Sequence, residues 1–236
     1  MNLIHIVYSA KYAFVATTLV FALALFSFFT FEPSVGRALT DNFTVTQTIS
    51  NEISFSTAAA DVSMVGTITG LTGGYSYGTT TVVVKTNNAT GYNMSLHFST
   101  TTSGESMQAS STAYINDYTP TAGDVAQGNS PDFEWVDNAS GQAAEFGYAV
   151  YASSTTEVTA AFLNNGSACG SGSNTSNRCW ANPTTSPKSI ISTASPTPGS
   201  GSTTTIQFKI AAPNPPSPLL PTGTYIATGT LTAVTN

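Results

Sequence analysis

The chain has 236 residues, of which 41% are hydrophobic, 11% aromatic and only 8% charged, and its formal net charge is −6. The hydrophobic share is large enough for a core, which excludes a fully disordered chain. The six basic residues form no cluster, which argues against nucleic acid and anionic membrane surfaces as partners. We therefore expect a domain rich in β-structure.

A long apolar run, residues 13–31, follows Lys11 near the N-terminus. It exceeds the ~7–15 residues of an ordinary signal-peptide core and approaches the ~20 residues that span a bilayer. Gly36 and Ala38 supply the small residues that signal peptidase needs at the −3 and −1 positions of its site. The run is therefore predicted to be either a cleaved signal peptide or an uncleaved signal anchor.

This interpretation divides the chain into residues 1–38, the signal or anchor, and residues 39–236, one exported β-sandwich domain. Lys11 is expected to stay on the cytoplasmic side, so that everything after residue 38 faces outward. The predicted location is extracellular or at the cell surface, reached through the secretory pathway. Contact with the membrane is expected only through residues 13–31, and only if the segment is uncleaved.

Apolar and polar residues alternate along much of the exported part, as they do in half-buried strands. In the first such segment, residues 43–49, Phe43, Val45 and Ile49 share one face and threonines occupy the other. A glycine-rich turn is expected at residues 71–78. Further strands are expected at 51–57, 61–70, 79–86, 92–100, 132–136, 144–152, 158–163 and 203–212, with weaker ones at 113–115 and 189–193.

No exported segment shows a sustained helical period, and many short strands are separated by turn signals. This pattern predicts an all-β fold, an antiparallel β-sandwich of Greek-key or jelly-roll-like topology. The last strand, residues 225–234, follows a proline-rich loop. We expect it to return antiparallel beside residues 206–210 and so to close the domain within the same chain.

The sequence contains two cysteines, Cys169 and Cys179, on either side of a loop rich in glycine, serine and asparagine. An even number of cysteines in an exported chain predicts a disulfide. A ring of this size stabilises a fold by about 2–3 kcal/mol in the loop-entropy model. With no histidine nearby, the pair cannot complete a tetrahedral metal site, and a staple for one loop is the expected role.

Groups for acid–base chemistry are few, because the chain has only two histidines, His5 and His97. His5 belongs to the signal segment, and His97 alternates with Leu96 and Phe98, which predicts that it faces solvent. No G-x-S-x-G turn is present to expose a nucleophilic serine. The sequence therefore predicts a protein that is not an enzyme and carries no cofactor.

Three acidic residues, Asp132, Glu134 and Asp137, are candidate calcium ligands, since extracellular modules often bind calcium through oxygen atoms. They lack the D-x-D-x-D-G loop, and they alternate with Phe133 and Trp135 as in a strand with a polar outer face. The second interpretation is the commoner one for such a pattern.

Aromatic residues suggest a platform for sugar rings. Tyr75 and Tyr77 lie in the glycine-rich segment, and Trp135 and Trp180 lie near predicted loops. Tyrosine and tryptophan can stack on glycans, although packing inside the protein is the more common fate of a tryptophan. These four residues are the candidate glycan contacts.

Two stretches, TTTVVVKTNNATGYNMSLHFS and PTGTYIATGTLTAVTN, resemble the two halves of the WxL-type surface domain of bacteria. In that family a strand and turn lead to a G-W-x-L motif, and the chain closes on T-W-x-L. Residues 91–94 stand at the first motif and residues 230–233 at the second, with Tyr92 and Leu231 in place of the tryptophans. The layout is also similar to exported β-proteins of small-genome bacteria. The resemblance implies a domain that attaches non-covalently to the cell wall.

Taken together, these features favour a non-enzymatic, exported structural or adhesive protein of the cell surface. Two alternatives stay open: a glycan-binding module, and a filament subunit whose N-terminal strand completes the sandwich of a neighbour. The expected partners are a cell-envelope polymer, other surface proteins, or further copies of the chain.

Overall fold

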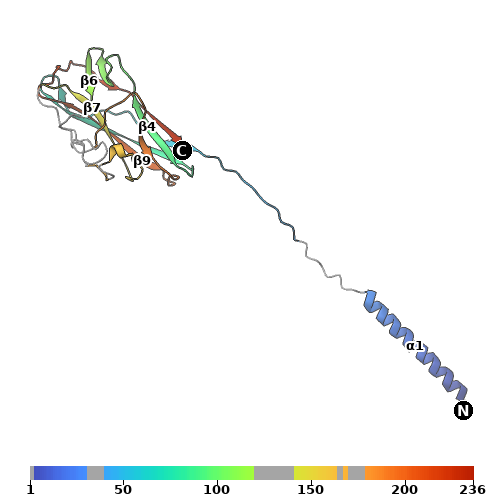
Figure 1. Cartoon of the computed structure of the whole chain (residues 1–236). Helices are drawn as coiled ribbons and strands as arrows, with labels where there is room; N and C mark the ends of the chain where they lie inside the picture. Colours follow the sequence, from blue (N-terminus) through green and yellow to red (C-terminus); the bar gives the residue numbers. More distant parts are fainter. Residues whose placement is uncertain (1–2, 31–39, 120–140, 164–166, 170–178) are drawn as a thin grey trace. The chain divides into compact units, whose positions relative to one another are not determined.

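The computed structural model describes residues 3–30, 40–119, 141–163, 167–169 and 179–236 (Figure 1). The chain divides into two units, Met1–Thr48 and Ile49–Asn236. The second unit begins ten residues after the predicted domain start at residue 39, because the residues between take no part in its core.

The first unit contains a single long helix, α1 (Leu3–Thr30). Its span Ala10–Ser27 is long and apolar enough to cross a membrane by length and composition, and Lys11 is its only charged residue. The hydroxyl groups of Thr17 and Thr18 donate to backbone carbonyls one turn earlier, at 2.7 Å and 2.6 Å. The helix therefore satisfies these polar groups internally, as a bilayer requires.

Residues 40–52 form neither a helix nor a strand. The predicted half-buried strand at 43–49 is therefore wrong for the single chain. Phe43, Val45 and Ile49 are 85%, 82% and 80% exposed. Their alternation is a property of the sequence, but burial also requires a partner strand, and none of the described residues supplies one.

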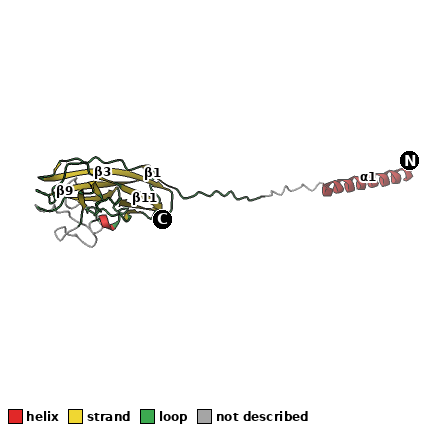
Figure 2. Ribbon diagram, turned by 90° about the horizontal axis from the view of Figure 1, so that it is seen from above, coloured by secondary structure: helices red, strands yellow, loops and turns green. Residues whose placement is uncertain are grey.

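The second unit is an antiparallel β-sandwich, as predicted (Figure 2). The larger sheet has the order β1-β3-β9-β7-β6-β5-β10, with β2 beside β3, and the smaller has the order β11-β4-β8. All pairs are antiparallel except β6 with β7. The elements are β1 (Ile53–Thr57), β2 (Ile68–Thr69), β3 (Gly73–Thr86), β4 (Tyr92–Phe98), β5 (Met107–Ser110), β6 (Ala113–Asp117), β7 (Glu145–Ala152), the 3-10 helix η1 (Ala160–Phe162), β8 (Lys188–Ser192), β9 (Ser202–Ala212), β10 (Ile226–Ala227) and β11 (Gly229–Thr235).

The core lies between the two sheets. Strand β4 alternates strictly, and its inward residues Tyr92, Met94, Leu96 and Phe98 are buried, as the sequence predicts. The Phe98 ring meets the Phe146 ring of β7 edge-on, with centroids 5.8 Å apart. Such pairs are worth about 0.5–1.5 kcal/mol beyond the area they bury, so this contact helps to hold the two sheets together.

The last strand closes the domain, but beside a different partner from the one predicted. β11 pairs with β4 over its whole length, from Gly229 opposite Phe98 to Thr235 opposite Tyr92. It cannot pair with residues 206–210, because β9 lies inside the larger sheet with β3 on one side and β7 on the other. The closing strand therefore completes the opposite sheet.

Two other predicted elements differ from the structure. The expected glycine-rich turn is the first part of β3, where Gly73 and Gly74 have φ values of 67° and 132° and still pair with β2 and β9. A Cβ atom on Gly73 would lie 2.1 Å from the Pro213 carbonyl oxygen, so glycine is needed there for close approach of the chain. The predicted strand at 158–163 contains η1 instead, and the one at 132–136 lies outside the described residues.

Candidate functional site

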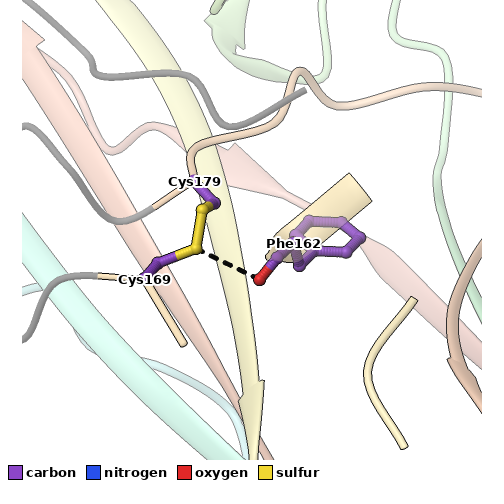
Figure 3. The surroundings of a disulfide bond; sticks show 3 residues. All are labelled: Phe162, Cys169 and Cys179. Carbon is purple, nitrogen blue, oxygen red and sulfur yellow. Dashed lines mark hydrogen bonds between the residues drawn. A yellow bond between two sulfur atoms is a disulfide. The ribbon is translucent and has the colours of Figure 1, made fainter. Parts of the chain in front are cut away.

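The predicted disulfide is present between Cys169 and Cys179, whose Cα atoms are 5.9 Å apart (Figure 3). The Cys169 sulfur lies 3.2 Å from the carbonyl oxygen of Phe162, the last residue of η1. Two residues beyond Cys179, Ala181 exchanges backbone hydrogen bonds with Tyr148 of β7, at 2.7 Å and 3.1 Å. The disulfide therefore joins Cys169, which lies against the end of η1, to a segment hydrogen-bonded to the larger sheet, which is a structural role.

Three of the four candidate glycan contacts lie near one another. Tyr77 of β3 pairs with Lys209 of β9, and the Lys209 Nζ lies 5.4 Å from the Tyr75 ring centroid and 5.7 Å from the Trp180 ring centroid. Trp180 is fully buried, whereas Tyr75 is 39% exposed. The Tyr75 and Trp180 rings thus both lie beside the Lys209 ammonium group. A cation–π contact of this kind is worth about 2 kcal/mol when it is desolvated. Trp135 lies outside the described residues.

The candidate calcium ligands Asp132, Glu134 and Asp137 also lie outside the described residues. Among the residues that are described, no three His, Cys, Asp or Glu side chains are grouped to hold a metal ion. Two described carboxylates, Glu105 and Asp117, stabilise the β5–β6 hairpin: Ser106 Oγ donates to Asp117 at 2.8 Å, and the Asp117 N–H donates to Glu105 at 2.6 Å. Burial raises the pKa of Asp117.

His97, the histidine outside the signal segment, lies on β4 opposite Thr230 of β11. It is half-buried, whereas the sequence predicts that it faces solvent. Its Nδ1 has no hydrogen-bond partner in the described part of the chain. A histidine acting as a general base is normally oriented by a partner on its second nitrogen. The described part of the chain provides no such orienting partner for the Nδ1 of His97.

The most developed feature of the second unit is an apolar groove of about 610 Å³ between the two sheets. This volume is about four times the ~150 Å³ of a cavity that holds a benzene molecule, so several side chains fit inside. The groove walls are mainly Phe146, Ile206, Phe208 and Ile210 from the larger sheet and Leu96 and Leu231 from the smaller.

The rims of the groove come from segments outside the central strands. Residues 59–64 form one rim, where Val62 and Met64 pack against Gly78 of β3. Residues 224–227, which include β10, form the other. Asp61 and Ser63 add a few polar groups to the first rim. An apolar hollow with sparse polar groups is the usual form of a binding site.

The groove is bordered by β11, the edge strand of the smaller sheet. Within the described residues, β11 pairs with β4 on one side and with nothing on the other. Its side chains Thr230, Thr232 and Val234 are exposed, and Leu231 and Ala233 are half-buried toward the core. No described strand forms ladder hydrogen bonds along the outer side of β11, although β1 lies close to part of it, so this edge is where another strand can pair.

The position of β11 is fixed at its end. The Asn88 side chain donates to the Asn236 carbonyl oxygen at 3.1 Å, and the Asn236 side-chain amide donates to the carbonyl oxygens of Thr90, at 2.9 Å, and Thr193, at 2.6 Å. The open edge is therefore presented by a strand that is held in place.

Comparisons of the chain with protein-family models, with curated proteins and with solved structures found no match. The observations above define the class of protein: an antiparallel β-sandwich with a disulfide, preceded by an apolar helix, with an open groove along one strand edge.

Proposed function

We propose that this chain is a non-enzymatic structural or adhesive protein exported to the cell surface. The observation that carries the proposal is the open edge of β11 beside the apolar groove, because an exposed sheet edge takes up an extended polypeptide segment by strand addition. The few acid–base groups of the described chain agree with a role in binding or assembly.

Two features support the location. The Cys169–Cys179 disulfide is typical of oxidising compartments outside the cytoplasm. The helix α1 is long and apolar enough to act as a signal anchor or as a signal sequence.

Among the alternatives, the open edge of β11 favours the filament subunit assembled by strand exchange. The glycan-binding alternative is less favoured, since Trp180 is buried against Lys209 and presents no face to a sugar.

Labelling of intact cells tests the proposal. Thr81 is exposed on β3, and a Thr81→Cys variant of the full chain should react with a membrane-impermeant maleimide before lysis. Reaction only after lysis would contradict export. The mass of the recovered chain then separates a mature start at residue 39 from an uncleaved chain that starts at Met1.

A further inference from the structure

We infer that the groove is filled by residues 43–49 of a second copy of this chain, which add as a strand to the open edge of β11. The inference rests on the proposed function, since it names the segment that the surface protein takes up. It follows from the chemistry of the donor segment, the geometry of the acceptor edge and the hydrogen bonds that hold residues 50–52 beside the end of β3.

The donor segment has the pattern of a strand and no partner. Phe43, Val45 and Ile49 share one face, and each is at least 80% exposed. The opposite face carries only threonines, which suit a solvated sheet surface, and residues 43–49 contain no charge. Burying this row of exposed apolar side chains against a second surface is favourable, because it removes apolar area from water.

The acceptor is the outer edge of β11 together with the apolar groove beside it. The outer edge of β11 has unpaired backbone groups, and Leu231 of β11 lines the apolar groove. A strand added beside β11 would direct every second side chain into the groove and leave the others in solvent. The only polar residue on the apolar donor face is Gln47, and Asp61 and Ser63 on the groove rim offer oxygen acceptors to its amide.

The donor must come from another copy because the chain is held in line with β1 as far as Ser50. Asn87, at the end of β3, donates from its side-chain amide to the Ser50 carbonyl oxygen at 3.0 Å and accepts from the Glu52 N–H at 2.7 Å. The Thr86 hydroxyl also donates to the Glu52 carbonyl oxygen, at 2.6 Å. A return to the groove within the same chain would need a tight turn at the residues that Asn87 fixes.

Mixed single-cysteine variants test this assignment. Thr46 lies at the centre of the donor on its polar face, and Thr230 and Thr232 flank Leu231 on the exposed face of β11. The full chain with Thr46→Cys, coexpressed with the full chain carrying Thr230→Cys or Thr232→Cys, should form a disulfide-linked dimer. The matched control pairs Thr46→Cys with Thr81→Cys, on an exposed position of β3 away from the edge, and should give no dimer.

Each other outcome overturns the inference. Equal dimer in the test and control pairs would show random collision, and no dimer in either would show that the edge is unoccupied by this segment. A doubly substituted chain that forms only an internal disulfide would show that the donor folds back. A cross-link from the β11 cysteine to a different protein would assign the groove to that partner. Surface labelling of the same cysteines reports export independently of the dimer.

Charge substitution gives a second test that leaves the domain intact. Val45→Asp changes a side chain that is 82% exposed, so the melting temperature of the single chain should not change. Association should weaken by about a hundredfold or more, because a carboxylate would enter an apolar groove without a counter-charge. Thr46→Asp adds the same charge on the solvent face and should keep association nearly intact. If both variants associate as strongly as the unmodified chain, the assignment is contradicted.

Discussion

The two edges of the smaller sheet differ in how their backbone groups are satisfied. On the β8 side, the N–H of Ser192 donates to the Glu157 carbonyl oxygen at 2.8 Å, and the N–H of Thr159 donates to the Ile190 carbonyl oxygen at 3.1 Å. Val158 bridges Ile191 between them. On the β11 side no described strand forms such hydrogen bonds, although β1 lies close to part of β11. One edge is thus covered by the chain itself, and the other has no hydrogen-bonded neighbour among the described strands.

The open edge lacks the usual protection against unwanted pairing. Proteins commonly protect exposed edges with charged residues, prolines or bulges. β11 has the sequence GTLTAVT, which contains neither a charged residue nor a proline, and its pairing with β4 is regular from end to end. An unprotected edge of this kind beside an apolar groove is prone to pair with another strand, as the proposed strand addition requires.

The largest expected effect comes from removing the edge strand itself. Deleting residues 224–236 should prevent folding, because β4 would lose its neighbour and the core would lose Leu231. Deleting residues 40–48 should leave the melting temperature unchanged, since their large apolar side chains, Phe43 and Val45, are 85% and 82% exposed. Circular dichroism melts of both variants measure the difference. A cooperative melt of the first variant near the full-length temperature would contradict the account.

The next largest effect is expected from removing the Cys169–Cys179 disulfide. Cys169→Ser should lower the free energy of unfolding by about 2–3 kcal/mol, because the disulfide closes the loop between residues 169 and 179 and so restricts the unfolded chain. Denaturant unfolding of the variant, and of the unmodified chain under reducing conditions, should show the same loss. Two reactive thiols in the oxidised, unfolded protein would show that the bond does not form.

Opening the covered edge should have a smaller effect. Thr159 has φ −66°, which proline adopts without strain, so Thr159→Pro removes the N–H donated to Ile190 and the hydroxyl donated to the Ser189 carbonyl oxygen. The expected loss is about 1–2 kcal/mol. Thr159→Val is the control that keeps the N–H, and it should lose less. Equal losses in the two variants would mean that the edge bond contributes nothing to stability.

The smallest effect is expected from Lys188, which lies on β8 with its Nζ 5.5 Å from the Phe162 ring centroid. Burial lowers its pKa in the folded protein. Between that lowered pKa and the ordinary value of 10.5, the unfolded chain binds more protons, so this lysine makes stability rise with pH across the window. Lys188→Met should be more stable than the unmodified chain at neutral pH, and the difference should shrink toward pH 10.5. A constant difference across this range would contradict the assignment.

The sequence predicts the inward faces well where a strand has neighbours on both sides. The alternation in residues 92–98 identifies the buried side of β4 correctly, and the disulfide follows from the cysteine count in an exported chain. The same alternation in residues 43–49 predicts a strand equally clearly, yet the single chain leaves it exposed. A periodic pattern indicates which side chains need burial, but not whether the same molecule buries them.

The groove was not predictable from local patterns. It depends on the pairing of β11 with β4 instead of β9. β11 cannot pair with β9, because β3 and β7 already occupy both sides of β9. Such long-range pairing leaves no short-range signal in residues 225–234. The available sequence signal was the strand pattern of residues 43–49, for which the described sandwich provides no neighbouring strand.

Hydrogen exchange of the full chain at low and high protein concentration tests the central claim most directly. The amides of β8 should be protected at both concentrations, because residues 157–159 cover that edge. The amides of β11 and of residues 43–49 should gain protection together as the concentration rises. Protection of β11 that is already complete in the dilute monomer, or that does not change with concentration while residues 43–49 stay exposed, would contradict the account.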